Sequence, residues 1–144
     1  MIRKITILLI ALTFAACATQ NLGSAVKTSD QMVKDAKASI REVSVDDVKK
    51  MIDNKEKIII LDVRDSDEFE TGSIPGAVNL SRGMLEFKIS TKIPDKNAAI
   101  IVYCGIDLRG PLATRTLNEF GYKNAVNING GLTAWKAAGY PIEK

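Results

Sequence analysis

The side chains best suited to chemistry in this sequence gather around one cysteine, Cys104, and the short segment that follows it, 105–110. The thiolate is the nucleophilic form of cysteine, and a nearby positive charge stabilises it. Arg109 supplies such a charge within the segment. An isolated cysteine is more commonly a small buried hydrophobe, but that role would not need a glycine, an aspartate and an arginine before the next helix. The pattern therefore predicts a nucleophilic cysteine.

Two elements must position this cysteine. The apolar run 98–103 is typical of a buried strand, and the spacing of apolar residues over 112–120 is typical of a helix. The first N–H groups of a helix have no partner inside it, so they point at whatever atom the preceding loop presents. We therefore expect backbone N–H groups of the loop to stabilise the thiolate and to cradle an anion.

The rest of the sequence alternates strands with helices. Predicted strands cover 40–43, 58–61, 77–80, 98–103 and 125–128. Predicted helices cover 30–39, 45–52, 66–70, 84–89, 111–120 and 132–138, with Ser29 and Ser44 as N-caps of the first two. This alternation predicts an α/β fold, in which a parallel sheet of about five strands has helices on both faces. Ligands in such folds bind at the carboxyl ends of the strands, where Cys104 lies.

Three charged side chains lie near the same predicted edge of the sheet. Arg82 follows the third strand, and the sequence leaves open whether it contacts a substrate or solvent. Arg64 and Glu68 are expected to form a structural ion pair. The candidate catalytic residue is thus Cys104, and the candidate substrate-binding residues are Gly105, Ile106, Asp107, Leu108, Arg109, Gly110 and Arg82.

Composition restricts the class of protein. The chain has 144 residues, enough for one domain, with 46% hydrophobic and 26% charged residues. Its net charge is +3, but without Arg3 and Lys4 the balance is 18 basic against 17 acidic residues, or +1. No stripe of Lys and Arg interleaved with aromatic residues is present. These features argue against a nucleic-acid partner.

The N-terminus carries the three parts of a secretory signal: Arg3-Lys4, the apolar stretch 5–14, and Ala15-Ala16 before Cys17. The apolar stretch is too short for a membrane-spanning helix, which needs about 20 residues. The sequence around Cys17 resembles a bacterial lipoprotein signal, in which the cysteine becomes the lipidated first residue, although Phe14 departs from that pattern. Cleavage by ordinary signal peptidase after Ala18 is the alternative.

Either route predicts that the domain is exported. A lipid on Cys17 would tether the domain to a membrane without embedding it. The expected division is a signal peptide at 1–16, a tether at 17–28 and a folded domain at 29–144 that begins with a docking helix. Cys17 then lies outside the domain, which leaves Cys104 without a disulfide partner. The chain has no histidine, which removes Ser-His and Cys-His dyads and histidine-bearing zinc sites.

From Ser44 to Lys144 the sequence resembles the rhodanese-like domain of the single-domain sulfurtransferase type. The resemblance rests on segments in a fixed order: Ile60-Leu61-Asp62-Val63-Arg64 with Glu68-Phe69, Gly72-Ser73-Ile74-Pro75-Gly76-Ala77-Val78-Asn79, Val102-Tyr103-Cys104, Gly121-Tyr122, and Gly130-Gly131-Leu132-Thr133-Ala134-Trp135 with Ala138-Gly139-Tyr140-Pro141. The resemblance implies a rhodanese-like fold. It also implies that Cys104 accepts sulfur as a persulfide and passes it on, while the 105–110 backbone cradles the anion.

Two residues depart from the family pattern. Relatives commonly have a basic or polar residue just after the cysteine and a glycine two positions further on, where this chain has Gly105 and Asp107. Aspartate tolerates a left-handed backbone at a cost of about 1 kcal/mol. A carboxylate about 6 Å from a thiolate opposes it by about 1–3 kcal/mol, which Arg109 could offset. We therefore expect weak turnover of thiosulfate or a different sulfur donor.

Loop length separates two chemistries of this fold. Cysteine phosphatases, including the cell-cycle phosphatases that share the rhodanese-like fold, place five residues between cysteine and arginine to encircle a phosphate. Four residues separate Cys104 from Arg109 here. The shorter loop favours a sulfur-sized site over phosphoryl transfer.

The sequence thus predicts an exported sulfurtransferase of the periplasm or cell envelope, lipid-anchored through Cys17. It would move sulfane sulfur from a small anion such as thiosulfate to a thiol or to cyanide through a persulfide of Cys104. No metal and no organic cofactor are implied, and the membrane is a partner only through the lipid. The alternative is a catalytically weak or inactive rhodanese-like module of the cell envelope that binds a partner or carries sulfur.

Overall fold

The computed structural model describes residues 26–144. The predicted signal peptide, Cys17 and most of the predicted tether lie outside the described residues. The helices are α1 (Ser29–Ser39), α2 (Val45–Asp53), α3 (Ser66–Glu70), the 3-10 helix η1 (Arg82–Met84), α4 (Leu85–Lys92), α5 (Arg109–Glu119) and α6 (Gly131–Ala137). The strands are β1 (Glu42–Val43), β2 (Ile59–Asp62), β3 (Val78–Asn79), β4 (Ile100–Tyr103) and β5 (Ala125–Ile128). Within residues 26–144 no helix is long and apolar enough to cross a membrane.

One five-stranded sheet organises the domain, in the order β1-β5-β4-β2-β3, and every neighbouring pair is parallel. The central strand β4 is buried along its whole length, which explains its continuous apolar sequence. Its register places Val102 opposite Leu61 of β2 and Asn127 of β5. The predicted α/β fold with a parallel sheet of about five strands is confirmed.

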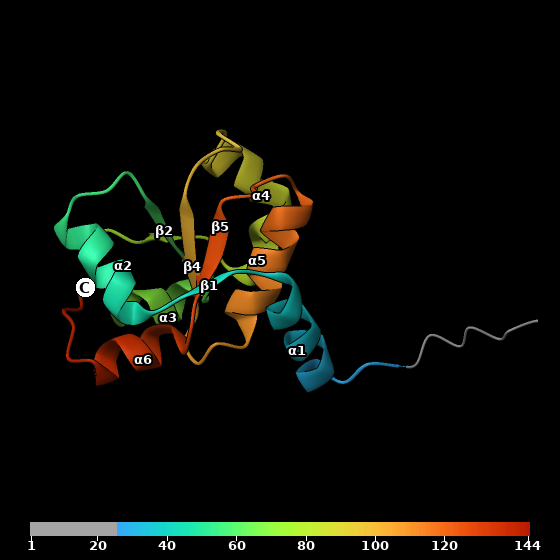
Figure 1. Cartoon of the computed structure of the whole chain (residues 1–144), viewed down its shortest axis with the longest axis horizontal. Helices are drawn as coiled ribbons and strands as arrows, with labels where there is room; N and C mark the ends of the chain where they lie inside the picture. Colours follow the sequence, from blue (N-terminus) through green and yellow to red (C-terminus); the bar gives the residue numbers. More distant parts are fainter. Residues whose placement is uncertain (1–25) are drawn as a thin grey trace, which may run out of the picture.

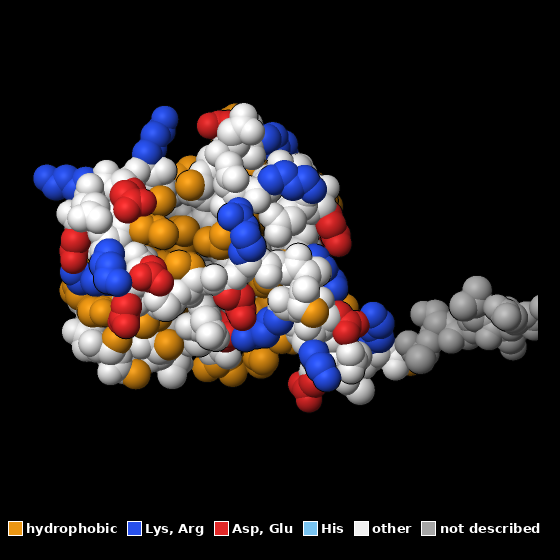
Figure 2. Space-filling model, viewed as in Figure 1, with side chains coloured by type: hydrophobic (Ala, Val, Ile, Leu, Met, Phe, Trp, Pro, Cys, Tyr) orange, Lys and Arg blue, Asp and Glu red, His pale blue; other side chains and the backbone are white. Residues whose placement is uncertain are grey.

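Helices cover both faces of this sheet (Figure 1). On one face α4 and α5 enclose a cluster that includes Leu85, Ile89 and Leu117. On the other face α2 and α6 pack Val48 and the fully buried Trp135 against the strands. The outer surface visible in Figure 2 carries Lys and Arg side chains interspersed with Asp and Glu. This surface shows the mixture of charges that the composition predicts.

The helix α1 packs against α5, to the right of the sheet in Figure 1. Ala36 is fully buried in this contact, which allows the two helices to approach closely. The N-cap is Thr28 rather than the predicted Ser29, because the Thr28 side chain accepts a hydrogen bond from the N–H of Gln31. At α2 the predicted cap is confirmed, since Ser44 accepts from the N–H of Asp47.

Elements at the carboxyl edge of the sheet differ from the predicted ones in ways that matter for the site. The helix α5 begins at Arg109, two residues earlier than the predicted start at Pro111. Arg109 and Gly110 therefore belong to the first helical turn, where N–H groups lack helical partners. The segment after β3 begins with η1, and α4 then continues to Lys92 instead of ending at Ile89.

Candidate active site

Cys104 follows β4 at the carboxyl edge of the sheet and is a free thiol with 1% of its surface exposed. The backbone N–H of Gly110 donates to its sulfur, with a distance of 3.3 Å between nitrogen and Sγ. The side chain of the N-cap residue Leu108 makes no capping hydrogen bond, and the Cys104 sulfur takes the position that a capping oxygen commonly occupies. The open end of the helix therefore presents a backbone N–H group to the sulfur.

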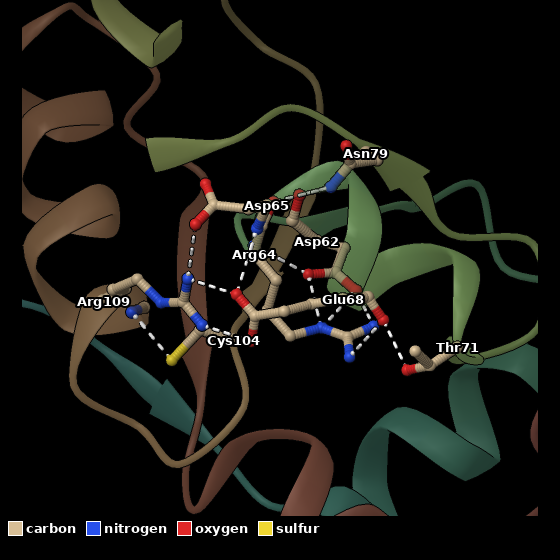
Figure 3. A network of polar contacts seen from close by, with 9 residues as sticks. Asp62, Arg64, Asp65, Glu68, Thr71, Asn79, Cys104 and Arg109 are labelled. Carbon is tan, nitrogen blue, oxygen red and sulfur yellow. Dashed lines mark hydrogen bonds and ion pairs between the residues drawn. The ribbon is translucent and has the colours of Figure 1, made fainter. Parts of the chain in front are cut away.

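Arg109 lies beside this sulfur, but its guanidinium already binds carboxylates (Figure 3). Its two terminal nitrogens donate to the Glu68 oxygens at 2.6 and 2.7 Å, and one of them lies 3.4 Å from an oxygen of Asp65. The hydrogen bond to Glu68 is the main cause that raises the pKa of Arg109, and it also lowers the pKa of Glu68. An anionic substrate must therefore compete with Glu68 for this arginine.

The start of α6 holds the carbonyl groups at the beginning of the loop. The N–H of Leu132 donates to the Cys104 carbonyl at 2.8 Å. The N–H and the hydroxyl of Thr133 donate to the Gly105 carbonyl at 3.0 and 3.1 Å. Gly131 permits this approach, because its φ is 60° and a Cβ there would lie 2.5 Å from the Cys104 carbonyl oxygen.

The middle of the loop alternates exposed and buried side chains. Ile106 is 67% exposed and Leu108 is 47% exposed, whereas Asp107 between them is 7% exposed, with a left-handed φ of 65°. The Asp107 carboxylate binds the Lys37 ammonium of α1 with one oxygen and accepts from the Asn127 amide of β5 at 2.7 Å with the other. The sequence suggests compensation of this charge by Arg109, and the structure corrects that expectation, because Lys37 compensates it.

Arg82, the remaining candidate substrate-binding residue, lies in η1. Its guanidinium donates to Glu86 of α4 at 2.7 Å and to the Thr116 hydroxyl of α5 at 3.3 Å. These bonds connect the two helices that cover one face of the sheet. A role of Arg82 toward a substrate stays a prediction.

A second arginine near the loop, Arg64, is buried and structural. It pairs with Asp62 at 2.6 Å and donates to the main-chain carbonyls of Glu68 and Gly72. The predicted ion pair between Arg64 and Glu68 is therefore wrong, because the Glu68 carboxylate binds Arg109 and only its carbonyl binds Arg64. Figure 3 shows the two arginines side by side, each with its own carboxylate.

Lys37 and Asn127 are the site residues that sequence reasoning missed. They contact Asp107 across separations of 70 and 20 residues, which no local spacing reveals. The available signal was an asparagine inside an otherwise apolar strand, since Asn127 is fully buried in β5 and a buried amide needs polar partners. A Cβ on Gly110 would collide with the Asn127 side-chain oxygen, so the same residue also explains why a glycine follows Arg109.

Fold and site together define a class: an α/β protein with a free cysteine between its central parallel strand and the N-terminus of the following helix. Within residues 26–144, no cluster of three or more His, Cys, Asp or Glu residues is arranged to hold a metal ion. The family model described as "Rhodanese-like domain" matches residues 44–138, about two thirds of the chain. The chain belongs to the rhodanese-like family.

Two relatives illustrate the similarity in sequence. The putative sulfur carrier protein YrkF of Bacillus subtilis is 33% identical over 98 residues, which are 68% of this chain and 52% of YrkF. The putative sulfurtransferase YtwF of Bacillus subtilis is 32% identical over 102 residues, which are 71% of this chain and 96% of YtwF. This chain therefore spans about half of one relative and nearly all of the other.

Among solved structures, the protein of unknown function RPA3614 of Rhodopseudomonas palustris, described as a possible tyrosine phosphatase, superposes with a TM-score of 0.76. It is 32% identical, and the match covers 82% of this chain and 96% of that protein. Because the match includes more than residues 44–138, it extends beyond the family model. The fold is thus shared well outside the loop that carries the cysteine.

Proposed function

We propose that this protein is a sulfurtransferase that moves sulfane sulfur from a small anionic donor to a thiol or to cyanide through a persulfide of Cys104. The observation that carries the proposal is the position of the sulfur: it accepts the Gly110 N–H at the open start of α5 and lies beside Arg109. Membership in the rhodanese-like family and the similarity to a putative sulfurtransferase support it.

The proposed reaction has two displacements. The Cys104 thiolate attacks the outer sulfur of thiosulfate, the sulfur–sulfur bond of the donor breaks, and sulfite leaves with the bonding electron pair. The product is a persulfide on Cys104, whose negative charge the nearby Gly110 N–H and Arg109 would stabilise. The acceptor thiolate or cyanide then attacks the outer sulfur, and the Cys104 thiolate leaves with the electron pair. No external oxidant or reductant is needed.

Electrostatics predict that doubly charged donors react slowly. Glu68 and Asp65 both bind Arg109, and a dianion must approach these two carboxylates to reach the sulfur. Asp107 contributes less to this repulsion than the sequence suggests, because Lys37 binds it. We therefore attribute the expected weak binding of thiosulfate to the carboxylates around α3 rather than to the loop, and a donor of lower charge would be favoured.

The test is intact mass spectrometry of the full chain after exposure to thiosulfate, with Cys104→Ser as the matched control. The proposal predicts a gain of one sulfur atom on the wild type alone, which cyanide removes with formation of thiocyanate. If thiosulfate adds no sulfur, the experiment is repeated with polysulfide. Failure with both donors overturns the sulfurtransferase proposal.

A second candidate function is an inactive module that binds a partner or carries sulfur. Burial favours it, since 1% of the Cys104 surface is exposed and Arg109 is already engaged by Glu68. A module that only binds a partner would resist alkylation by iodoacetamide as well as sulfur loading. Hydrolysis of p-nitrophenyl phosphate is a further control, and the four residues between Cys104 and Arg109 predict none.

For the location of the protein we propose export to the periplasm or cell envelope, with Cys17 lipidated and the domain tethered to the membrane by that lipid. The support is the signal-like sequence of 1–16. The mass of the mature N-terminus tests it: a diacylated Cys17 supports lipidation, and a chain that begins just after Ala18 supports ordinary cleavage. A mature chain that still begins at Met1 overturns both.

A further inference from the structure

Four polar side chains form a cluster at the middle of the loop 105–108, and three of them come from elements outside the loop. Lys37 of α1 binds Asp107 and lies 3.4 Å from an oxygen of Glu42 in β1. The Asn127 amide of β5 donates to Asp107 at 2.7 Å and to Glu42 at 2.9 Å. The cluster thus contains two carboxylates and one cation, and Lys37 is the charge that both carboxylates share.

Asp107 depends on this cluster for two reasons. Its side chain is 8% exposed, and a carboxylate removed from water needs a counter-charge and hydrogen bonds. Its backbone has a φ of 65°, a conformation that costs a non-glycine residue about 1 kcal/mol or more and persists only where contacts enforce it. The pKa of Lys37 is raised, first by the hydrogen bond to Asp107, so the ammonium form that binds Asp107 is the stable one.

The loop geometry at the sulfur follows from the conformation of Asp107. Asp107 is separated from Gly110, whose N–H donates to the sulfur, by Leu108 and Arg109 only. A change of φ at Asp107 would rotate the following peptides and move this N–H. Lys37 itself lies outside residues 44–138, the part of the chain that matches the family model.

We propose that Lys37 is a positioning residue for sulfur transfer: by holding the Asp107 carboxylate, it fixes the loop so that the backbone N–H of Gly110 reaches the Cys104 sulfur. This inference rests on the proposed function for its role in catalysis, but the reactivity of the thiol tests it independently. It assigns to α1 a direct part in the site, in addition to its packing against α5.

The experiment compares Lys37→Met with Lys37→Arg in the full chain, with Lys34→Met as the matched control. Lys34 is an exposed lysine on the same helix. Two rates are measured: alkylation of Cys104 by iodoacetamide, which needs no sulfur donor, and loading of sulfur from polysulfide. We expect Lys37→Met to lower both rates about tenfold, in line with the loss of a hydrogen bond between charged groups. Lys37→Arg should restore them to within about threefold, because it keeps the charge.

A double variant separates positioning from general support of the fold. In an Asp107→Gly background the loop needs no counter-charge, and glycine accepts the left-handed φ. Lys37→Met should then change the alkylation rate by less than about twofold. The double variant lacks both members of the ion pair between Lys37 and Asp107, so it remains informative even if the single variant Lys37→Met does not fold.

Two results would overturn the inference: unchanged alkylation in Lys37→Met, or an equal loss in the Asp107→Gly background, which would assign the effect to α1 packing. The sulfurtransferase proposal fails differently. If wild-type Cys104 is alkylated but takes sulfur from no donor, that proposal is lost, and the effect of Lys37 on alkylation still decides the inference.

Discussion

The loop 105–108 is held from two sides by different kinds of contact. On the α6 side, backbone N–H groups of Leu132 and Thr133 bind the carbonyls of Cys104 and Gly105. On the α1 side, the side chains of Lys37 and Asn127 bind the carboxylate of Asp107. The α6 contacts need only that Gly131 be small, whereas the α1 contacts need particular side chains and charges.

The two supports also differ in their position relative to the family model. Gly130-Gly131-Leu132-Thr133 lies within residues 44–138, where the family model matches, and Lys37 lies before them. Backbone contacts survive most substitutions, while an ion pair between distant segments depends on both partners. The α1 side therefore depends on a segment that lies outside the family model, and the comparison of the two sides predicts effects of decreasing size.

The largest effect is expected from Gly131→Ala, which breaks the α6 support. The new Cβ would lie 2.5 Å from the Cys104 carbonyl oxygen, and the φ of 60° disfavours any side chain. Overpacking and backbone strain together should lower the free energy of unfolding by about 2–4 kcal/mol. Urea denaturation measures this loss, and sulfur loading of Cys104 should fall with it.

The control for this variant is Gly139→Ala, in the turn after α6. Its φ is 74°, but a Cβ there would meet nothing within 4 Å. It should therefore show only the backbone cost of about 1 kcal/mol. If the two alanine variants were equally destabilised, the close approach of α6 to the loop would contribute nothing.

The next effect is expected from Asn127→Asp on the α1 side. It places a third carboxylate beside Glu42 and Asp107, with Lys37 as the cation that they share. Because residue 127 is fully buried, the free energy of unfolding should fall by about 2 kcal/mol at neutral pH. Asn129→Asp, at an exposed position two residues later, is the control and should change stability by less than about 0.5 kcal/mol.

Acidification sharpens this prediction. The added carboxylate should be protonated more readily in the folded state, so the loss in Asn127→Asp should shrink as the pH falls. A loss that is independent of pH would show that the amide acts through shape alone.

A smaller effect on stability, which depends on pH, is expected on the α1 side and not on the α6 side. The pKa of Lys37 in the folded state is raised above its ordinary value of 10.5. Its stabilisation is therefore complete below 10.5 and is lost as the pH rises through the higher folded value. The difference in unfolding free energy between wild type and Lys37→Met should be at most about 1 kcal/mol, given the partial exposure of Lys37.

Urea denaturation over rising alkaline pH checks this expectation, with Lys34→Met to subtract the general effect of losing a lysine. The difference should disappear at high pH. The backbone contacts of α6 contain no titrating group, so Gly131→Ala should remain destabilising over the same range. Similar pH dependence in both variants would remove the distinction between the two supports.

Much of the fold could be predicted from local sequence, because local rules determine it. The apolar run into Cys104 gave the central strand, Ser44 gave the start of α2, and strand 125–128 was placed without error. The start of α5 was harder to predict, because the residue before Arg109 is Leu108, which cannot act as a side-chain N-cap. The Cys104 sulfur accepts the hydrogen bond from the Gly110 N–H instead. That bond exists only once β4 and α5 are in place.

The proximity of Cys104 and Arg109 could be predicted from the sequence, and the ion pairs around them could not. Spacing suggested Arg64 with Glu68, but the fold pairs Arg64 with Asp62 and Glu68 with Arg109. The sequence showed that Asp107 brings a negative charge into the loop. It could not show that Lys37, 70 residues away, binds that charge. Partner choice among charged side chains depends on which segments meet, and that is a property of the tertiary structure.

The smallest effect is expected from Thr133→Val. This variant removes the hydroxyl that donates to the Gly105 carbonyl at 3.1 Å, but keeps the N–H that donates at 3.0 Å. Because the side chain is exposed, stability should fall by about 0.5 kcal/mol or less, and the alkylation rate of Cys104 should stay near that of wild type. A loss as large as that of Gly131→Ala would mean that a side chain, and not the backbone, holds the loop on the α6 side. The two supports would then be alike in kind, and the dependence on Lys37 would no longer set the α1 side apart.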